Sequence, residues 1–207
     1  MVTKAGIIVF RHADDKDGDN KNVTREIPNN VKVFDEKGDP VDSIKIRCSR
    51  LNSKGEVRAK FFGEILPKWI ATQIKPVTHV IVQDPRLSHE PTTSNPYDTV
   101  RFYLEAMGQL VTAPIKVHFS SSYEQTIEYA TRKLSENKSV MICATRQWLW
   151  GDDKSHIDSD RILGSLNKTK ELVTYPEKGK TIYIFDDAYK LTEFHVSDST
   201  HTIKEGP

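Results

Sequence analysis

The sequence predicts an α/β fold, a three-layer α/β/α sandwich with a mostly parallel central sheet. The first observation is a set of continuous apolar runs, at residues 6–10, 78–83 and 139–144, which are typical of strands buried on both faces. The second is that segments with helical periodicity lie between these runs. The chain of 207 residues has no internal repeat or low-complexity linker, so we expect one domain spanning 1–207.

The composition favours an ordinary soluble protein of the cell interior. The formal net charge is +1 with 29% charged residues, so no overall field favours nucleic acid or a membrane as a partner. No apolar run approaches the roughly 18 residues that a membrane-spanning helix needs. Residues 1–4 show neither a signal nor a transit peptide, and Cys48 and Cys143 are too few for a disulfide framework. We therefore expect an intracellular, cytoplasmic protein.

The first strand ends abruptly in the dipeptide Arg11-His12. A long polar loop or flap is then expected over residues 14–52, with short strand-like pieces at 31–34 and 44–47. This segment is longer than an ordinary connection between a strand and a helix, and loops of that length are usually lids or flaps.

The first helix is predicted to begin at Ser53, because Ser53 and Glu56 have the spacing of a capping box. Apolar residues then recur at four-residue spacing, with two neighbours that widen the stripe: Val57, Phe61, Phe62, Ile65, Leu66 and Trp69. Such a stripe is expected to pack on the sheet. We expect its aromatic side chains to belong to the core rather than to a ligand site.

A second helix is predicted from Asn95 to Gly108. Asn95 precedes Pro96, which is favoured in a first helical turn, so Asn95 is expected to cap the helix. Gly108 is expected to terminate it. The remaining elements are a strand at 115–117, a helix from 121, a short helix at 160–166, strands at 181–186 and 190–196, and a polar tail from 197 that is expected to fray.

Three strand ends carry the residues that could act in binding or catalysis. They are Arg11-His12, the loop from Asp84 to Asn95, and Thr145-Arg146. Ligands of open α/β sheets bind beyond the carboxyl ends of the strands, so Arg11, His12 and Arg146 are predicted to converge on an anion pocket there. The alternatives are a surface role for Arg11, a structural role for His12 and a local acidic partner for Arg146.

Two tryptophans follow the last of these strand ends. Trp148 could line a pocket for an apolar or aromatic ligand, and so could Trp150. The alternative, which we favour, is that both side chains pack onto the core.

Four segments of the sequence, taken in chain order, carry a resemblance to a known family. The first is Ile8-Val9-Phe10-Arg11-His12-Ala13, and the second is residues 51–59, LNSKGEVRA. The third contains Asp84-Pro85 and Ser94-Asn95-Pro96-Tyr97-Asp98-Thr99, and the fourth is the strand at 139–144. They resemble the R-H-G/A turn, the L-T-x-x-G-x-x-Q/R-A helix start, the S-x-P … S-x-R-P-x-x-T segment and the late strand of the histidine phosphatase superfamily, also called phosphoglycerate mutase-like. The resemblance covers roughly residues 5 to 190.

The resemblance implies roles for particular residues. In the family, the arginine of the turn, here Arg11, binds phosphate, and the adjacent histidine, here His12, attacks phosphorus to give a phosphohistidine that water hydrolyses. The family's second arginine falls at Asn95 and its second histidine at Arg146, so this half of the site is altered. The general acid has no clear counterpart, and the candidates are Glu124, Asp14 and His118.

Three functions follow from this combination. The first is a divergent phosphohydrolase that acts on a small phosphorylated metabolite through His12, with low activity. The second is an inactive pseudophosphatase that binds an anionic ligand or a protein partner. The third is non-phosphoryl chemistry on a carboxylate-bearing small molecule held between Arg11 and Trp148. No cofactor is implied, no histidine pair has metal-ligand spacing, and the sequence leaves the oligomeric state open.

Overall fold

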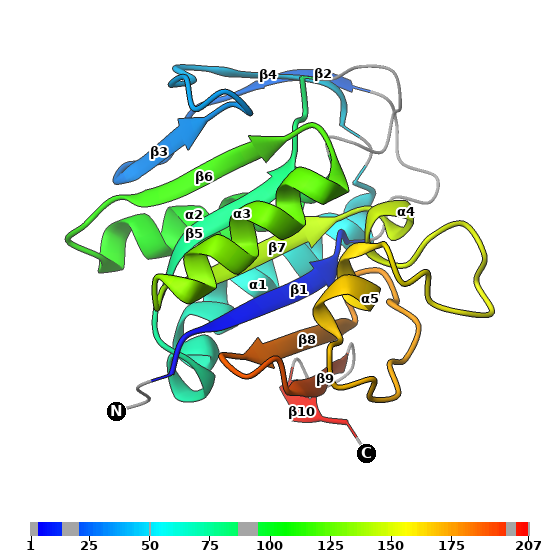
Figure 1. Ribbon diagram of the computed structural model, residues 1–207. Coiled ribbons are helices and arrows are strands. Elements are labelled where there is room, and N and C mark those ends of the chain that lie inside the picture. Colours follow the sequence, from blue (N-terminus) through cyan, green and yellow to red (C-terminus); the bar gives the residue numbers. More distant parts are fainter. Residues whose placement is uncertain (1–3, 14–20, 50, 87–94, 198–201, 207) are drawn as a thin grey trace.

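An eight-stranded mixed sheet forms the centre of the computed structural model (Figure 1), with strand order β10-β9-β8-β1-β7-β5-β6-β3. The structure describes residues 4–13, 21–49, 51–86, 95–197 and 202–206. The predicted α/β class is confirmed. The strands of this sheet are β1 (Gly6–Arg11), β3 (Val31–Phe34), β5 (Val77–Gln83), β6 (Ile115–Ser120), β7 (Ser139–Ala144), β8 (Thr181–Asp186), β9 (Leu191–Ser197) and β10 (Thr202–Glu205).

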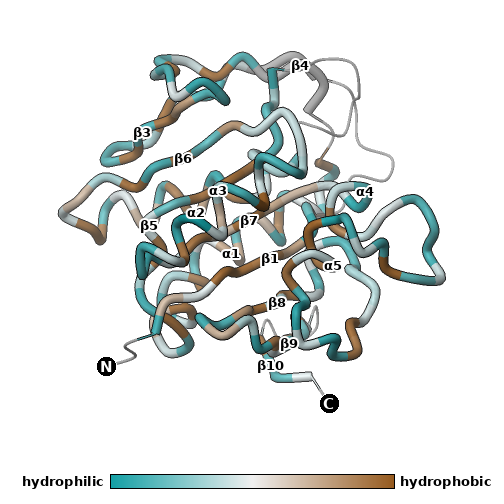
Figure 2. Tube along the Cα trace, in the orientation of Figure 1, coloured by the Kyte–Doolittle hydropathy of each residue, from teal (hydrophilic) through white to brown (hydrophobic). Residues whose placement is uncertain are grey.

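The sheet has a parallel half and an antiparallel half. β1, β7, β5, β6 and β3 pair in parallel, whereas β8, β9 and β10 extend the sheet from β1 in antiparallel fashion. Three of these parallel strands, β1, β5 and β7, are the continuous apolar runs of the sequence, as the hydropathy colouring of Figure 2 shows. Because parallel strands end at the same edge, the residues that follow β1, β5 and β7 lie near one another.

Helices cover both faces of the sheet. Alternate residues of β1 belong to different core clusters, Ile8 and Phe10 to one and Ile7 and Val9 to the other. The first cluster includes residues of α1 (Ser53–Gln73) and α2 (Asn95–Leu110). The second includes residues of α3 (Tyr123–Ser135), α4 (Arg146–Leu149) and α5 (Ile162–Leu166).

The first helix differs in two details from the prediction. Its N-cap is Asn52 rather than Ser53, because the Asn52 side chain accepts a hydrogen bond from the Gly55 N–H at 2.9 Å. Val57 is 58% exposed rather than buried. Residues at four-residue spacing drift around a helix of 3.6 residues per turn, so one stripe at that spacing cannot stay on the sheet along its whole length. Trp69 is half-buried and packs edge-on against Phe194.

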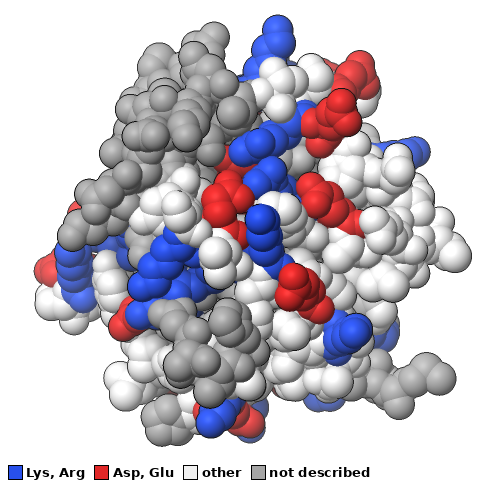
Figure 3. Space-filling model, turned by 180° about the vertical axis from the view of Figure 1, so that it is seen from behind, with Lys and Arg blue, Asp and Glu red and all other residues white. Residues whose placement is uncertain are grey.

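The second helix also continues beyond its predicted end. It runs to Leu110, and Gly108 lies inside it. A Cβ at Gly108 would lie 2.1 Å from the Asn29 carbonyl oxygen, so glycine is needed there for the close approach of the chain before β3 and not for termination. The α2–α1 face, seen in Figure 3, carries basic and acidic side chains side by side, and Arg101 of α2 pairs with Glu56 of α1 at 2.7 Å.

The two strand-like pieces predicted within residues 14–52 are confirmed as β3 (31–34) and β4, which continues to Ser49, and strands also form where none was predicted. Within residues 14–52, β3 is the edge strand of the main sheet, and β2 (Lys21–Arg25) pairs with β4 (Ile44–Ser49) in a separate two-stranded sheet. In the tail, Thr202–Glu205 pairs with β9, so the expectation of fraying is wrong for these residues. In the described part of the chain, no helix is both long and apolar enough to cross a membrane.

Candidate functional site

The carboxyl ends of β1, β7 and β5 are joined by hydrogen bonds that continue past the strands. The His12 N–H donates to the Ala144 carbonyl at 3.2 Å, one residue beyond the pairing of Arg11 with Ala144. The Thr145 N–H then donates to Oε1 of Gln83 at 2.8 Å. These contacts hold the His12 turn against the end of β7, at the edge where the sequence predicts the site.

The imidazole of His12 is held in one tautomer. Its Nδ1 lies 2.8 Å from the Ala13 carbonyl oxygen, and the side chain is 2% exposed. A carbonyl oxygen only accepts hydrogen bonds, so Nδ1 carries the proton in this contact. In the neutral ring the lone pair is then on Nε2, which is the arrangement a nucleophilic or basic imidazole requires.

The turn that orients His12 is itself held by the first turns of α2. The Ala13 N–H donates to Oγ1 of Thr99 at 2.9 Å, and this hydroxyl donates to the Asn95 carbonyl at 2.8 Å. Thr99 and Asn95 are completely buried. Thr99 therefore fixes the residue whose carbonyl fixes the His12 ring, and sequence reasoning did not select it as a site residue. The sequence signal that could have identified Thr99 is that it ends Ser94-Asn95-Pro96-Tyr97-Asp98-Thr99, part of the third of the four segments that resemble the family.

Asn95, at the position of the family's second arginine, is fully buried in the first turn of α2. Asn95 is uncharged, so this position supplies no guanidinium. The neighbouring carboxylate of Asp98 is also fully buried and pairs with Nε of Arg25 at 3.0 Å. This ion pair ties β2 to α2 near the same edge.

A second arginine nevertheless lies beside the β1 turn, and it comes from α1. Nη1 of Arg58 donates to the Lys178 carbonyl at 2.6 Å, and Nη1 of Arg11 donates to the Pro176 carbonyl at 3.4 Å. Gly179, with φ of +60°, donates its N–H to the Arg11 carbonyl at 3.1 Å. A Cβ at Gly179 would lie 2.6 Å from Cδ of Arg58 and 3.3 Å from Cα of Ala13, so this glycine lets the two segments meet.

The Arg146 side chain contacts the backbone of the loop that follows α4. Its Nη1 donates to the carbonyls of Gly151 and Asp152 at 2.7 and 2.8 Å. The local partner considered for this arginine is thus backbone rather than the Asp152 carboxylate. Arg146 begins α4 at the same sheet edge as His12. Convergence of the Arg11, His12 and Arg146 side chains on one pocket stays a prediction.

The two tryptophans pack on the core, as favoured from the sequence. Trp150 is 5% exposed, and its ring meets Tyr175 edge-on with centroids 5.5 Å apart. Trp148 is partly buried against the same core cluster. A ligand role for Trp148 therefore has no support from its packing.

Two of the three candidate acids, Glu124 and His118, lie in the described part of the chain. Glu124 is an exposed residue of the first turn of α3, and a hydrogen bond from the Tyr123 hydroxyl lowers its pKa, which opposes proton donation at neutral pH. Asp14 lies outside the described residues. His118 is on β6, three strands from β1, where burial lowers its pKa to about 4. Among the described residues, no group of three His, Cys, Asp or Glu side chains is arranged to hold a metal ion.

Comparisons with known proteins add little to this geometry. No family model matches the chain, and no curated protein matches it. A solved structure described as "Putative Phosphohistidine Phosphatase SixA", from Nakamurella multipartitia, is similar over 88% of this chain and 84% of that chain, with 11% identity and a TM-score of 0.36. A likeness at this level does not assign the chain to a family.

Proposed function

We propose that this chain is a divergent phosphohydrolase of the histidine phosphatase type, built on an α/β/α sandwich and acting on a small phosphorylated metabolite through His12. The observation that carries the proposal is the contact between Nδ1 of His12 and the Ala13 carbonyl. It supports a ring that carries its proton on Nδ1 and its lone pair on Nε2. An imidazole in this form is a competent nucleophile near neutral pH.

The reaction has two balanced steps. In the first, Nε2 of His12 forms a bond to phosphorus while the bond from phosphorus to the ester oxygen breaks, and the departing oxygen takes a proton from an acid or from water. In the second, a water oxygen bonds to phosphorus, the nitrogen–phosphorus bond breaks, and the water proton passes to solvent. Inorganic phosphate and neutral His12 result.

The charges around the turn suit a phosphoryl group. Arg11 and Arg58 bring two guanidinium groups to the segment beside Ala13, and phosphoryl transfer depends mainly on positioning and on stabilising negative charge. The family's second arginine is replaced by buried Asn95, and loss of one such donor typically lowers the rate by about a hundredfold to a thousandfold. We therefore expect slow turnover.

Access to His12 sets a further condition. With the side chain 2% exposed, a substrate reaches Nε2 only when neighbouring residues move. Opening of an active site often limits the rate of turnover, and closure afterwards excludes water from the reacting centre. A small substrate fits this requirement better than a large one.

The test is hydrolysis of para-nitrophenyl phosphate by the full chain and by His12→Asn. We expect slow hydrolysis by the native protein, an acid-labile phosphoenzyme that can be trapped by rapid denaturation, and loss of both in the variant. His118→Asn is the matched control, because it alters a half-buried histidine three strands away and should keep the activity. Full activity in His12→Asn would eliminate His12 as the nucleophile.

The second candidate is a pseudophosphatase that binds an anion without turnover. It is favoured by Arg146, whose guanidinium donates to two carbonyls of its own loop instead of presenting a proton-transferring group. NMR tests whether inorganic phosphate binds without turnover. A phosphate-induced shift of the His12 imidazole signals, combined with no hydrolysis and no phosphoenzyme, would favour this function over the first.

A further inference from the structure

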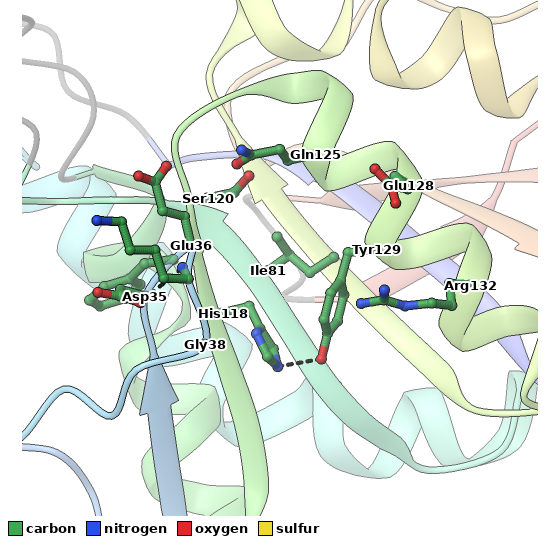
Figure 4. A pocket seen from close by; sticks show the side chains of 12 residues that line it. Asp35, Glu36, Gly38, Ile81, His118, Ser120, Gln125, Glu128, Tyr129 and Arg132 are labelled. Carbon is green, nitrogen blue, oxygen red and sulfur yellow. Dashed lines mark hydrogen bonds between the residues drawn. The ribbon is translucent and has the colours of Figure 1, made fainter.

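A cleft of about 380 Å³ lies away from the His12 turn, on the α3 face of the sheet (Figure 4). One wall is the turn that follows β3, and the other is α3. The floor is formed by the carboxyl halves of β5 and β6. The lining residues are Asp35, Glu36, Lys37, Gly38, Ile81, His118, Phe119, Ser120, Gln125, Glu128, Tyr129 and Arg132. β6 is three strand spacings from β1, roughly 14 Å at about 4.8 Å each.

The floor of the cleft is apolar and uncharged at neutral pH. The Tyr129 hydroxyl is hydrogen-bonded to Nε2 of His118, and the two ring centroids lie 4.0 Å apart. The His118 ring also stacks on Phe34, at 5.4 Å, and on His79, at 6.1 Å. Burial of His118 lowers its pKa to about 4, so the imidazole is neutral near pH 7. Together with Ile81, these rings make a surface for an apolar group.

Both walls carry acidic and basic side chains. Asp35, Glu36 and Lys37 belong to the turn, and Glu128 and Arg132 belong to α3. The Asp35 carboxylate accepts the N–H groups of Lys37 and Asp39 within the turn, which leaves Glu36, Lys37, Glu128 and Arg132 to consider. In the described part of the chain, none of these four side chains forms an ion pair. With Asp35 included, the five lining charges sum to −1, so the cleft does not favour a phosphate, and this small net charge gives no strong preference for a polycation.

The pair on the helix is the informative one. Glu128 and Arg132 are four residues apart, the spacing and order at which an ion pair is favoured on a helix. The guanidinium of Arg132 instead lies over the Tyr129 ring, 5.2 Å from its centroid. One turn further, Lys133 and Glu136 do form an ion pair, at 2.9 Å. The described contact of Arg132 is thus with the aromatic floor and not with Glu128.

We infer that this cleft binds a small zwitterion with an apolar side chain, of the free amino acid type. The ligand carboxylate is received by Arg132 and the ammonium group by Glu128, one turn apart on α3. The apolar side chain lies on Tyr129 and the other floor residues. This arrangement satisfies charges of both signs, which neither a simple anion nor a simple cation does. The inference is independent of the proposed phosphohydrolase activity.

The test is an NMR titration of the full chain with L-leucine, observed at the imidazole signals of His118. Leucine is expected to shift these signals at millimolar concentration. N-acetyl-L-leucine lacks the ammonium group and L-leucinamide lacks the carboxylate, so each is expected to bind at least about tenfold more weakly, as loss of one charged hydrogen-bonding partner predicts. Equal binding of all three compounds, or no shift with leucine, would overturn the inference.

Variants locate the binding and separate it from the His12 site. Arg132→Gln and Glu128→Gln are each expected to weaken leucine binding by about tenfold or more. Arg161→Gln is the matched control, because Arg161 lies over the Tyr123 ring at 4.2 Å, outside the cleft, and its loss should change nothing. His12→Asn should bind leucine normally whether or not the phosphohydrolase proposal holds. Native affinity in both Arg132→Gln and Glu128→Gln would contradict the assignment.

Discussion

His12 and His118 are both largely withdrawn from solvent, and each has one ring nitrogen in a short contact, but the partners differ in kind. His12 meets a backbone carbonyl, which only accepts, so the proton position on the ring is settled. His118 meets the Tyr129 hydroxyl, which can donate or accept, so the contact alone leaves two tautomers open. A fixed tautomer suits chemistry at the second nitrogen, whereas a hydroxyl partner suits a neutral packing role.

The supports behind the two histidines differ in the same way. The His12 turn is tied by main-chain hydrogen bonds to β7 and by Thr99 to α2. His118 is held by ring stacking with Phe34 and His79 and by one side chain of α3. The first arrangement controls direction, and the second controls burial and protonation.

The largest expected effect is on stability in acid, and it belongs to the His118 side of the comparison. Burial, followed by neighbouring charges such as Lys133, lowers the pKa values of His79 and His118 from 6.5 to about 4. As pH falls from 6.5 to about 4, the unfolded chain binds protons that the folded chain does not. The free energy of unfolding should therefore fall across this window and be independent of these groups above it.

Urea midpoints between pH 7 and 4 measure this effect. The double variant His79→Gln/His118→Gln should have a lower midpoint at pH 7 but a shallower decrease toward pH 4. A decrease as steep as that of the native protein would show that carboxylates, rather than these two histidines, control acid unfolding.

The next effect tests the His12 side. Thr99→Val removes the hydroxyl that receives the Ala13 N–H while keeping the shape of the side chain. We expect a loss of about tenfold to a hundredfold in kcat/KM for aryl phosphate hydrolysis, the range seen when groups that orient a functional histidine are removed. Nitrogen NMR of the His12 ring should show a second tautomer, which a purely structural role for Thr99 would not produce.

A matched control is available on α3. Thr126 is also buried in a first helical turn and donates to a carbonyl four residues earlier, that of Ser122, at 3.0 Å. Thr126→Val should lower the melting temperature as Thr99→Val does, yet leave hydrolysis unchanged. Equal losses of activity in both variants would remove the orienting role from Thr99.

The parts of the fold that the sequence predicted well are those with one dominant physical cause. β7 was predicted at its observed bounds, and β5 to within one residue, because strands buried on both faces are continuous apolar runs. The stripe of α1 was less accurate because four-residue spacing drifts, leaving Val57 in solvent. Gly108 was misassigned because its close approach to Asn29 is a tertiary contact with no local signal.

The candidate site also has features that the local sequence could predict and features that it could not. The position of His12 at a strand end could be predicted from local sequence, because the strand and its abrupt polar end are adjacent. The roles of Thr99 and Arg58 could not, because they depend on contacts between segments 86 and 120 residues apart in the chain. Arg146 was placed at the correct edge, but its engagement with the carbonyls of Gly151 and Asp152 depends on how the following loop folds.

The smallest expected effect comes from removing the hydroxyl partner of His118. Tyr129→Phe keeps the ring contacts with His118 and loses one hydrogen bond, so the free energy of unfolding should fall by about 1 kcal/mol. No corresponding side-chain deletion exists for His12, whose partner is backbone. Urea denaturation measures the loss, and hydrolysis by the same variant should equal that of the native protein. A loss of several kcal/mol would mean that the Tyr129 hydroxyl satisfies His118 as strictly as the Ala13 carbonyl satisfies His12, and the distinction between the two histidines would fail.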